Sequence, residues 1–250
     1  MYDNDNDDDD MVPASPLDTF IAEGWIDEAL HEVKSGKEAT VYCCRGGAAS
    51  GGLMAAKVYR ARQQRGFKND AVYHEGRVIG DRRARRAAER KTAFGRETQF
   101  AAWIEHEFAT LSLLHAAGAA VPRPLTRSSN AILMGYVGDA YDPAPLLSAV
   151  SPTPDEARRL LHTLMREVEL WLTHNVVHGD LSPYNILWWR GSATVIDFPQ
   201  AVDPRVNANA QALLSRDIEN VCRYVARHGV RADHHRIADN LWRRFLRAEL

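Results

Sequence analysis

Apolar positions in the second half of the chain repeat at helical spacing. The clearest case runs from Leu160 to Leu172, where apolar residues recur every three or four positions. It is preceded by Thr153-Pro154-Asp155-Glu156, in which a capping threonine, a proline and a glutamate form a capping-box pattern. Similar patterns predict two closing helices over 207–228 and 233–248.

The first half of the chain mixes helical and strand patterns. A helix is predicted to begin at Ser15, which can cap it, and to carry an apolar stripe as far as Leu30. A second helix is predicted at Trp103–Leu114 and ends before Gly118. Other apolar runs predict strands, of which the first two would form a hairpin across a glycine-rich turn; their ranges are 39–43, 53–59, 131–136, 176–177, 186–189 and 193–196.

The order of these elements indicates the fold class. Strands with one helix come first, and mainly helices with short strands follow. Such segregation is typical of an α+β protein. We therefore expect a small sheet-rich lobe over 15–134 and a larger helical lobe over 135–250, with a hinge near 135–142.

Composition changes this picture at the N-terminus. Hydrophobic residues make up 45% of the 250 positions, enough for a core, yet no window approaches the roughly 18 uncharged apolar residues of a membrane span. Six aspartates in the first ten positions indicate a disordered acidic tail over 1–14 rather than a signal peptide. The three cysteines show no metal-binding spacing, so we expect a reduced, cytoplasmic protein without a membrane partner.

The formal net charge of −2 hides a basic segment. Twelve Lys or Arg residues fall between Arg60 and Arg96, against four acids, and the segment is only weakly periodic. We expect a flexible loop over about 60–100, with a helix over 81–92 as its one regular element. Its arginines could contact RNA phosphates or simply keep the loop solvated, and composition does not choose between these roles.

The strongest chemical signal is the loop His178-Gly179-Asp180-Leu181-Ser182-Pro183-Tyr184-Asn185, followed by a strand that ends at Asp197, twelve residues after the asparagine. Phosphoryl transfer explains this H-x-D-x-x-x-x-N spacing. Asp180 would orient a nucleophilic hydroxyl and accept its proton, while Asn185 and Asp197 would hold Mg²⁺ on a triphosphate. A polar turn between two strands is the alternative, but it does not account for the complete set.

The first half of the chain offers matching nucleotide-binding residues. Lys57 lies in a predicted strand, where a lysine reaches the α- and β-phosphates, and Glu107 is its natural ion-pair partner on the following helix. Glu105 competes for that role. The turn at Ser35-Gly36-Lys37 has a single glycine, but its backbone N–H groups could hold phosphate, with Ser35 and Lys37 adding donors.

Taken together, these motifs resemble the RIO family of atypical kinases, and its type-one branch most. The resemblance implies a bilobal protein-kinase-like fold and a serine/threonine protein kinase that uses ATP and Mg²⁺ and acts largely as an ATPase. The segments that carry it are KSGKEATVY (34–42), AAKVYR (55–60), FKNDAVY (67–73), WIEHEFATLSLLHAAGAAVPRPL (103–125), ILMGYVGD (132–139), PAPLL (143–147), HGDLSPYNIL (178–187), VIDFPQAV (195–202) and LLSRDIENVCRYV (213–225).

The resemblance also assigns roles to residues. It implies that Asp180 is the catalytic acceptor and that Asp197, besides holding Mg²⁺ with Asn185, accepts phosphate transiently. The nucleotide contacts that it implies come from the lysine strand, from a gatekeeper and from the backbone of the hinge: Lys57, Met134, Gly135 and Val137.

The sequence departs from ordinary protein kinases in the metal loop and beyond it. The loop reads Asp197-Phe198-Pro199, so the glycine that lets such a loop flip is absent. Only about twenty residues separate Asp197 from Asp217, which leaves no room for a full activation segment. A platform for docking peptides is therefore not expected, and the basic loop at 60–100 is its expected substitute.

Two other functions stay open at this point. Aminoglycoside- and choline-type phosphotransferases also use H-G-D-x-x-x-x-N and a following aspartate, although 250 residues leave little room for their helical insertions. The other is an ATP-gated binding module on ribosome precursors, with the basic segment on ribosomal RNA. The sequence does not indicate which protein would be the substrate.

Overall fold

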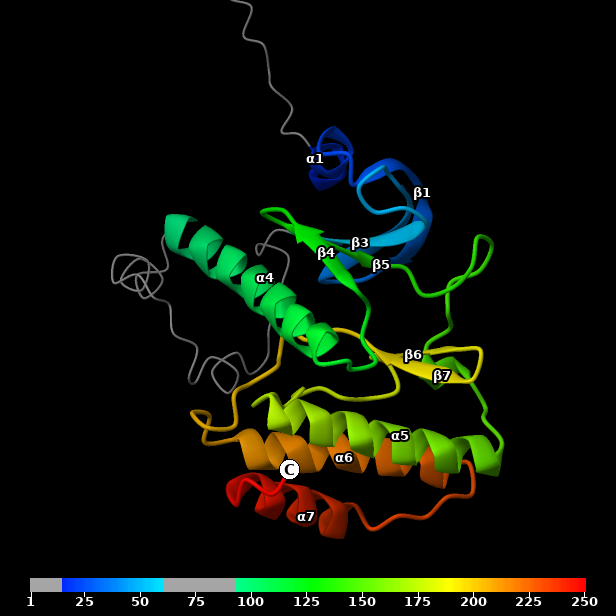
Figure 1. Ribbon diagram of the computed structural model, residues 1–250, viewed down its shortest axis with the longest axis vertical. Coiled ribbons are helices and arrows are strands. Elements are labelled where there is room, and N and C mark those ends of the chain that lie inside the picture. Colours follow the sequence, from blue (N-terminus) through cyan, green and yellow to red (C-terminus); the bar gives the residue numbers. More distant parts are fainter. Residues whose placement is uncertain (1–14, 61–92) are drawn as a thin grey trace, which may run out of the picture.

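The computed structural model describes residues 15–60 and 93–250, which form two lobes (Figure 1). The predicted acidic tail, the helix at 81–92 and the basic loop as far as residue 92 lie outside these described residues, whereas residues 93–100, predicted as the end of that loop, are helical. The smaller lobe is an antiparallel sheet of order β1-β2-β3-β5-β4, with the long helix α4 (Ala93–Ala116) beside it. Its strands are β1 (Ile26–Ser35), β2 (Ala39–Gly46), β3 (Leu53–Tyr59), β4 (Pro124–Arg127) and β5 (Ala131–Gly135).

The two faces of this sheet have different surroundings because side chains alternate along each strand. One face packs against the short helix α1 (Pro16–Ala22), whose Phe20 is fully buried. The opposite face carries Val41 and Lys57 toward the space between the lobes. The small core on the α1 side consists of Phe20, Ile26, Cys44, Met54, Ala56, Ala131 and Leu133.

The predicted helix from Ser15 to Leu30 is wrong in its second half. Ser15 does cap a helix, but α1 ends at Ala22, Gly24 adopts a left-handed φ of 73°, and the chain then enters β1. Only Ile26 of β1 is fully buried, so its apolar residues carried little information about secondary structure. This segment is a strand because its backbone pairs with β2. The local sequence pattern does not indicate that pairing.

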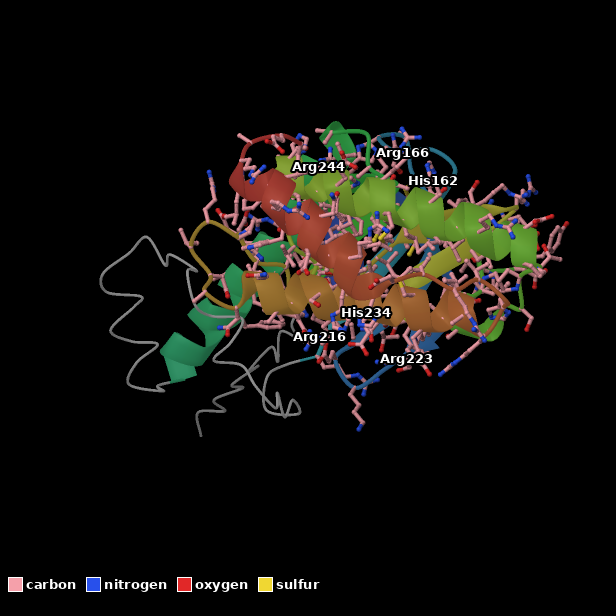
Figure 2. All side chains as sticks on the ribbon, turned by 90° about the horizontal axis from the view of Figure 1, so that it is seen from below. His162, Arg166, Arg216, Arg223, His234 and Arg244 are labelled. Atoms are coloured by element: carbon pink, nitrogen blue, oxygen red, sulfur yellow. The ribbon has the colours of Figure 1, made fainter. Side chains whose placement is uncertain are left out.

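The larger lobe is built on three helices, α5 (Pro154–Thr173), α6 (Ala210–Ala226) and α7 (His234–Leu246). Helices α5 and α6 lie side by side, and α7 covers them on the side away from the sheet (Figure 1, Figure 2). The predicted capping box of Thr153 and Glu156 is confirmed at the start of α5. The core between these helices includes Leu164, Trp171 and Ile218.

The chain leaves the sheet after Gly135, passes a 3₁₀ turn at Leu147–Ala149 and enters α5. A two-stranded ribbon, β6 (Ile186–Trp189) with β7 (Ser192–Val195), lies on the side of the larger lobe that faces the sheet. The predicted bilobal α+β architecture is therefore confirmed. Across residues 15–60 and 93–250, no helix combines the length and the apolar character needed to cross a membrane.

Candidate active site

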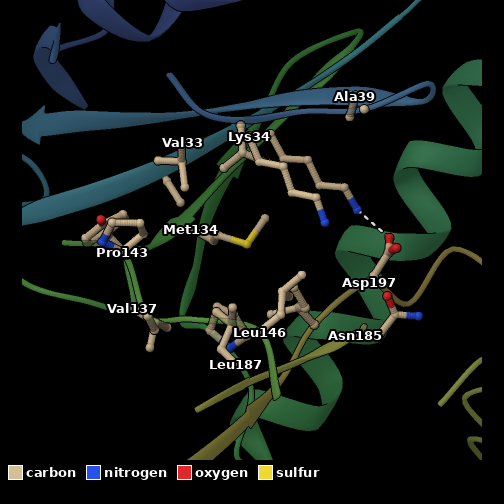
Figure 3. Close-up of a pocket in the computed structure, with 18 of the residues that line it drawn as sticks. Val33, Lys34, Ala39, Met134, Val137, Pro143, Leu146, Asn185, Leu187 and Asp197 are labelled. Atoms are coloured by element: carbon tan, nitrogen blue, oxygen red, sulfur yellow. Dashed lines mark hydrogen bonds and ion pairs between the residues drawn. The ribbon is translucent and has the colours of Figure 1, made fainter. Parts of the chain in front are cut away.

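A cavity of about 430 Å³ lies between the two lobes. One part of its wall is polar and carries Lys57, Asn185 and Asp197. The rest is mostly apolar, with side chains from both lobes facing each other (Figure 3). This size and polarity suit a ligand with a flat apolar portion and a charged tail. The apolar lining includes Val33, Val41, Ala55, Met134, Val137, Leu146 and Leu187.

Lys57 is held by two carboxylates at the polar part of this cavity. Its Nζ lies 2.6 Å from Glu107 Oε1 and 2.7 Å from Asp197 Oδ1. Burial works against the charged amine, but Asp197 and Glu107 together hold the pKa of Lys57 well above its ordinary value. Glu105, the competing candidate, forms an ion pair with Arg127 instead. The ion pair of Lys57 with Glu107 that the sequence predicts is therefore present.

Tyr59 completes this cluster, and the sequence reasoning missed it. Its hydroxyl donates a 2.5 Å hydrogen bond to Glu107 Oε2, so each carboxylate oxygen of Glu107 has one donor. Lys57 and Tyr59 are two residues apart on β3, and strand alternation places them on one face. The available signal was an aromatic residue with a polar tip two positions after the lysine, since a buried tyrosine hydroxyl usually finds a partner.

We expect Tyr59→Phe to weaken this cluster without disturbing its packing. The ring would keep its edge-on contact with Trp103, at 4.9 Å between centroids, while Glu107 would lose a donor. A hydrogen bond to a charged group contributes about 2 kcal/mol, so urea unfolding should show a loss of that order. Tyr42→Phe is the matched control, because the Tyr42 hydroxyl forms no hydrogen bond with residues 15–60 or 93–250. Equal stability of Tyr59→Phe and wild type would contradict this account.

The loop before β6 brings Asp180 and Asn185 together beside the cavity. Asn185 Nδ2 donates to the backbone carbonyl of Asp180 at 2.9 Å and to its Oδ2 at 3.1 Å. Asn185 Oδ1 accepts no hydrogen bond within the described part of the chain, so it is available to a ligand. Burial raises the pKa of Asp180, although the hydrogen bond from Asn185 acts in the opposite direction. A raised pKa suits a group that accepts a proton.

Helix α6 fixes this loop from behind through Asp217, a second residue that the sequence reasoning did not place in the site. Asp217 is 1% exposed and accepts hydrogen bonds from the backbone N–H groups of Gly179 at 2.8 Å and Leu181 at 2.9 Å. Arg216 donates to the Gly179 carbonyl. Gly179 has a φ of 78°, a left-handed conformation that favours glycine. The available signal was an acidic residue on the apolar stripe of a helix, because a buried carboxylate requires donors.

The backbone that presents Asp197 is held by an aromatic cluster. Asp197 has a φ of 73°, which is unfavourable for a residue other than glycine. Phe198 is 1% exposed and packs against His178 and Trp171, at centroid distances of 4.6 and 5.8 Å. Burial lowers the pKa of His178 to about 4, so the ring is neutral, and its Nε2 contacts the Ile196 carbonyl at 3.3 Å. These contacts tie the metal loop to the loop of Asp180.

The segment after β5 offers backbone groups to the cavity. The Val137 N–H donates no hydrogen bond within the described residues, and the Val137 carbonyl accepts from the Ala144 N–H at 2.9 Å. The Gly135 N–H already donates to the Arg123 carbonyl at 2.7 Å, so Gly135 can offer only its carbonyl. Met134 lines the cavity beside them (Figure 3). Val137 is therefore the available backbone donor for the predicted contact with adenine.

The turn between β1 and β2 separates its two predicted phosphate donors. Lys37 lines the cavity, as does Lys34 before it. Ser35 does not, because its hydroxyl lies 3.1 Å from that of Thr40 and accepts from Arg60 Nη2 at 2.6 Å. Successive strand residues alternate between faces, and the Ser35 side chain belongs to the face opposite the cavity. The structure thus gives no support to Ser35 as a phosphate donor.

These residues fit Mg²⁺ and a nucleoside triphosphate. Mg²⁺ takes oxygen ligands and is usually bound by one or two carboxylates together with substrate phosphates. Asp197 and Asn185 Oδ1 offer two such oxygens. Among the residues that the structure describes, no group of three or more His, Cys, Asp or Glu could hold a metal alone. A metal here would therefore depend on phosphate oxygens, as expected of a nucleotide site.

Comparison with known proteins agrees with this geometry. The model of the RIO domain matches residues 40–237. The RIO-type serine/threonine-protein kinase Rio1 of Haloferax volcanii is 34% identical over 86% of this chain and 69% of its own length. The serine/threonine-protein kinase RIO1 is 31% identical in Chaetomium thermophilum and 29% in Homo sapiens, over 86% and 84% of this chain. The alignments span only 43% and 35% of those two longer proteins.

One solved structure supports the fold. It is the Rio2 kinase–ADP/Mg²⁺–phosphoaspartate complex from Chaetomium thermophilum, with a TM-score of 0.61 and 21% identity, covering 90% of this chain and 64% of that one. At this identity the likeness concerns the fold alone. The family model spans most of the sequence, including the lysine strand, the Asp180 loop and the metal loop, and this chain belongs to the RIO family.

Proposed function

We propose that this protein is a Mg²⁺- and ATP-dependent phosphoryl transferase that acts as a serine/threonine protein kinase of the RIO type. One observation carries the proposal: Lys57 joins Glu107 and Asp197 in a cavity beside which Asp180 and Asn185 are hydrogen-bonded to each other. These side chains come from four separate segments and form the set that phosphoryl transfer requires. The relatives named as serine/threonine-protein kinases support the same reaction.

Each residue has a part in the proposed reaction. The apolar wall around Met134 would hold the adenine and exclude water, while Lys57 would bind phosphates. Asn185 and Asp197 would hold Mg²⁺, which neutralises phosphate charge when it is bound. Asp180 would orient the attacking hydroxyl and take its proton, a role that its raised pKa favours.

ATP hydrolysis is proposed as a large part of the activity. Between Asp197 and the start of α6 at Ala210 the chain forms turns and a single β-bridge, Val202 with Val177, and no helix or strand. A protein acceptor would find few contacts on this side of the cavity, so water would compete with it for the phosphoryl group. RNA or a ribosome precursor as a partner of the basic loop stays a prediction, because that loop falls largely outside the described residues.

A comparison of acceptors tests the proposed function. The purified full chain should release ADP from ATP only when Mg²⁺ is present, and it should label itself or a protein acceptor with phosphate from ATP. The alternative, a small-molecule phosphotransferase, predicts rapid phosphorylation of an aminoglycoside or choline without protein labelling. That outcome, or the absence of Mg²⁺-dependent ADP release, would contradict the proposal.

Asp197 is proposed to be a transient phosphate acceptor as well. The related Rio2 structure is a complex with phosphoaspartate. In this step a carboxylate oxygen of Asp197 would bond to the γ-phosphorus as its bond to ADP breaks, and water would later release inorganic phosphate. Burial works against the charge of Asp197, but Lys57 at 2.7 Å holds its pKa below the ordinary value, so the nucleophile is ionised.

A single-turnover experiment with γ-labelled ATP tests the acyl phosphate. Wild type should retain label that hydroxylamine removes, because hydroxylamine attacks acyl phosphates and leaves phosphoserine intact. Asp197→Asn should retain none of this fraction. Wild type that shows no hydroxylamine-sensitive label under single turnover would contradict this second role.

A further inference from the structure

Lys34 is a cation of the cavity that the proposed mechanism does not use. It is exposed, lies near the end of β1 and lines the cavity. Its side chain forms no ion pair or hydrogen bond with residues 15–60 or 93–250. Lys57, in contrast, already contacts two carboxylates. Lys34 is therefore free to bind an anion that enters the cavity.

The strand pairing places Lys34 in one row with Lys57. Lys34 pairs with Val41 of β2, and Val41 pairs with Lys57 of β3. Residues directly opposite each other on neighbouring strands point to the same face of a sheet. The two lysines therefore flank Val41 on the cavity face, with Cα atoms about 10 Å apart, or twice the strand spacing. Figure 3 shows the Lys34 side chain extending from the sheet into the cavity, toward Asp197.

A bulge in β1 produces this orientation. The pairing advances from Glu32 to Lys34 on β1 while it advances by a single residue, from Tyr42 to Val41, on β2. Val33 is the extra residue. In a regular strand Val33 and Lys34 would point to opposite faces, yet both line the cavity. Bulges beside active sites commonly redirect a side chain in this way.

The charges around the cavity favour a second cation for a phosphate ligand. Lys57 is balanced by Glu107 and Asp197, and Asp180 adds a further carboxylate beside the cavity. Lys37 and Glu38 also line the cavity and offset each other in charge, so a triphosphate would still meet more carboxylates than cations around Lys57.

We propose that Lys34 is a second phosphate-binding residue, which contacts the terminal phosphate of ATP from the β1 side of the cavity. The inference rests on the proposed function, because it takes ATP as the ligand. A lysine binds phosphate as a point charge on a flexible stem, so Lys34 can follow a phosphate that moves. Lys57, which contacts two carboxylates, has less freedom to do this.

Isothermal titration calorimetry tests the inference by comparing ligands with and without phosphates. Full-length wild type and Lys34→Ala are titrated with adenosine, with ADP and with AMP-PNP, a non-hydrolysable ATP analogue, in the presence of Mg²⁺. Lys34→Ala should bind AMP-PNP about fivefold more weakly, since an exposed charge pair contributes modestly, and should bind adenosine as wild type does. ADP, which lacks the terminal phosphate, should be affected less than AMP-PNP. The difference should shrink as ionic strength rises.

Two further variants serve as controls. Lys34→Arg should restore most of the affinity for AMP-PNP, because it keeps the positive charge. Arg45→Ala should bind every ligand as wild type does, since Arg45 is an exposed cation of β2 that pairs with Glu28 outside the cavity. Equal AMP-PNP affinity in Lys34→Ala and wild type would overturn the inference, and so would an equal loss for adenosine. Wild type that binds no adenine nucleotide would overturn the proposed function, and this inference with it.

Discussion

Asp180→Asn is expected to reduce the turnover of ATP about 1,000-fold and to leave ATP binding unchanged, because a positioned general base contributes about 10²–10⁴-fold. Asparagine has the shape of aspartate, and its carbonyl oxygen can still accept the hydrogen bond from Asn185 Nδ2. It cannot take a proton from the attacking hydroxyl. The variant should therefore separate the chemical step from the binding step.

Single-turnover release of inorganic phosphate, which requires attack by water, measures the chemical step of this variant, and calorimetry with AMP-PNP measures its nucleotide binding. Asp203→Asn is the matched control, because Asp203 pairs with Arg205 outside the cavity. Circular dichroism should be the same for both variants and wild type. Wild-type turnover in Asp180→Asn would remove Asp180 as the proton acceptor.

Lys57→Ala is expected to impair both catalysis and folding. The change removes the proposed contact between Lys57 and the phosphates, so kcat/KM for ATP should fall about 100-fold. It also leaves Glu107 buried without its counter-ion, and breaking a buried pair in this way typically costs about 3–5 kcal/mol. Asp197 is partly exposed and Glu107 can take up a proton, so we expect the lower end of that range.

The stability loss of Lys57→Ala should depend on pH. Burial already raises the pKa of Glu107, and losing Lys57 would raise it further. A carboxyl whose folded-state pKa exceeds its unfolded-state pKa destabilises the fold as pH rises above the unfolded value. Urea unfolding should therefore show a smaller loss at pH 5 than at pH 8.

The double variant Lys57→Ala/Glu107→Gln separates the two effects of removing Lys57. Glutamine carries no charge and can still accept the hydrogen bond from Tyr59. The double variant should recover stability relative to Lys57→Ala without recovering activity. If it is no more stable than the single variant, the buried charge of Glu107 is not the cause of the loss.

Elements with an unmistakable local pattern were predictable from the sequence, and elements defined by pairing were not. The start of α5 follows from Thr153 and Glu156, which stabilise a helix end by themselves. The range of β3 agrees with its apolar run. β1 was misassigned because nearly all its side chains face solvent, and β4 was missed because four residues carry too little pattern. β1 is a strand because it pairs with β2, and β4 is a strand because it pairs with β5.

The residues of the candidate site also fall into two groups, those that the sequence predicts and those that it does not. Lys57, Asp180, Asn185 and Asp197 stand in motifs whose spacing reflects their chemistry, so they could be proposed before any geometry was known. Tyr59 and Asp217 act on those residues across the fold, and Lys34 reaches the cavity through a bulge. These contacts are Tyr59 with Glu107, Asp217 with Gly179, and Lys34 in one row with Lys57. They form only when the chain folds, so the spacing of the residues along the sequence does not predict them.

The ion pair of Lys57 with Asp197 has a consequence for how ligand arrives. Each side chain already neutralises the other in the resting cavity. A phosphate alone would take Lys57 away from Asp197 and leave a carboxylate without a partner, and a metal ion alone would do the same to the amine. When a metal ion and phosphates bind together, the ion pair of Lys57 with Asp197 would be replaced by two contacts, Lys57 with phosphate and Asp197 with the metal ion. The resting contact would thus disfavour the binding of free nucleotide or of free metal ion and favour the binding of the two together.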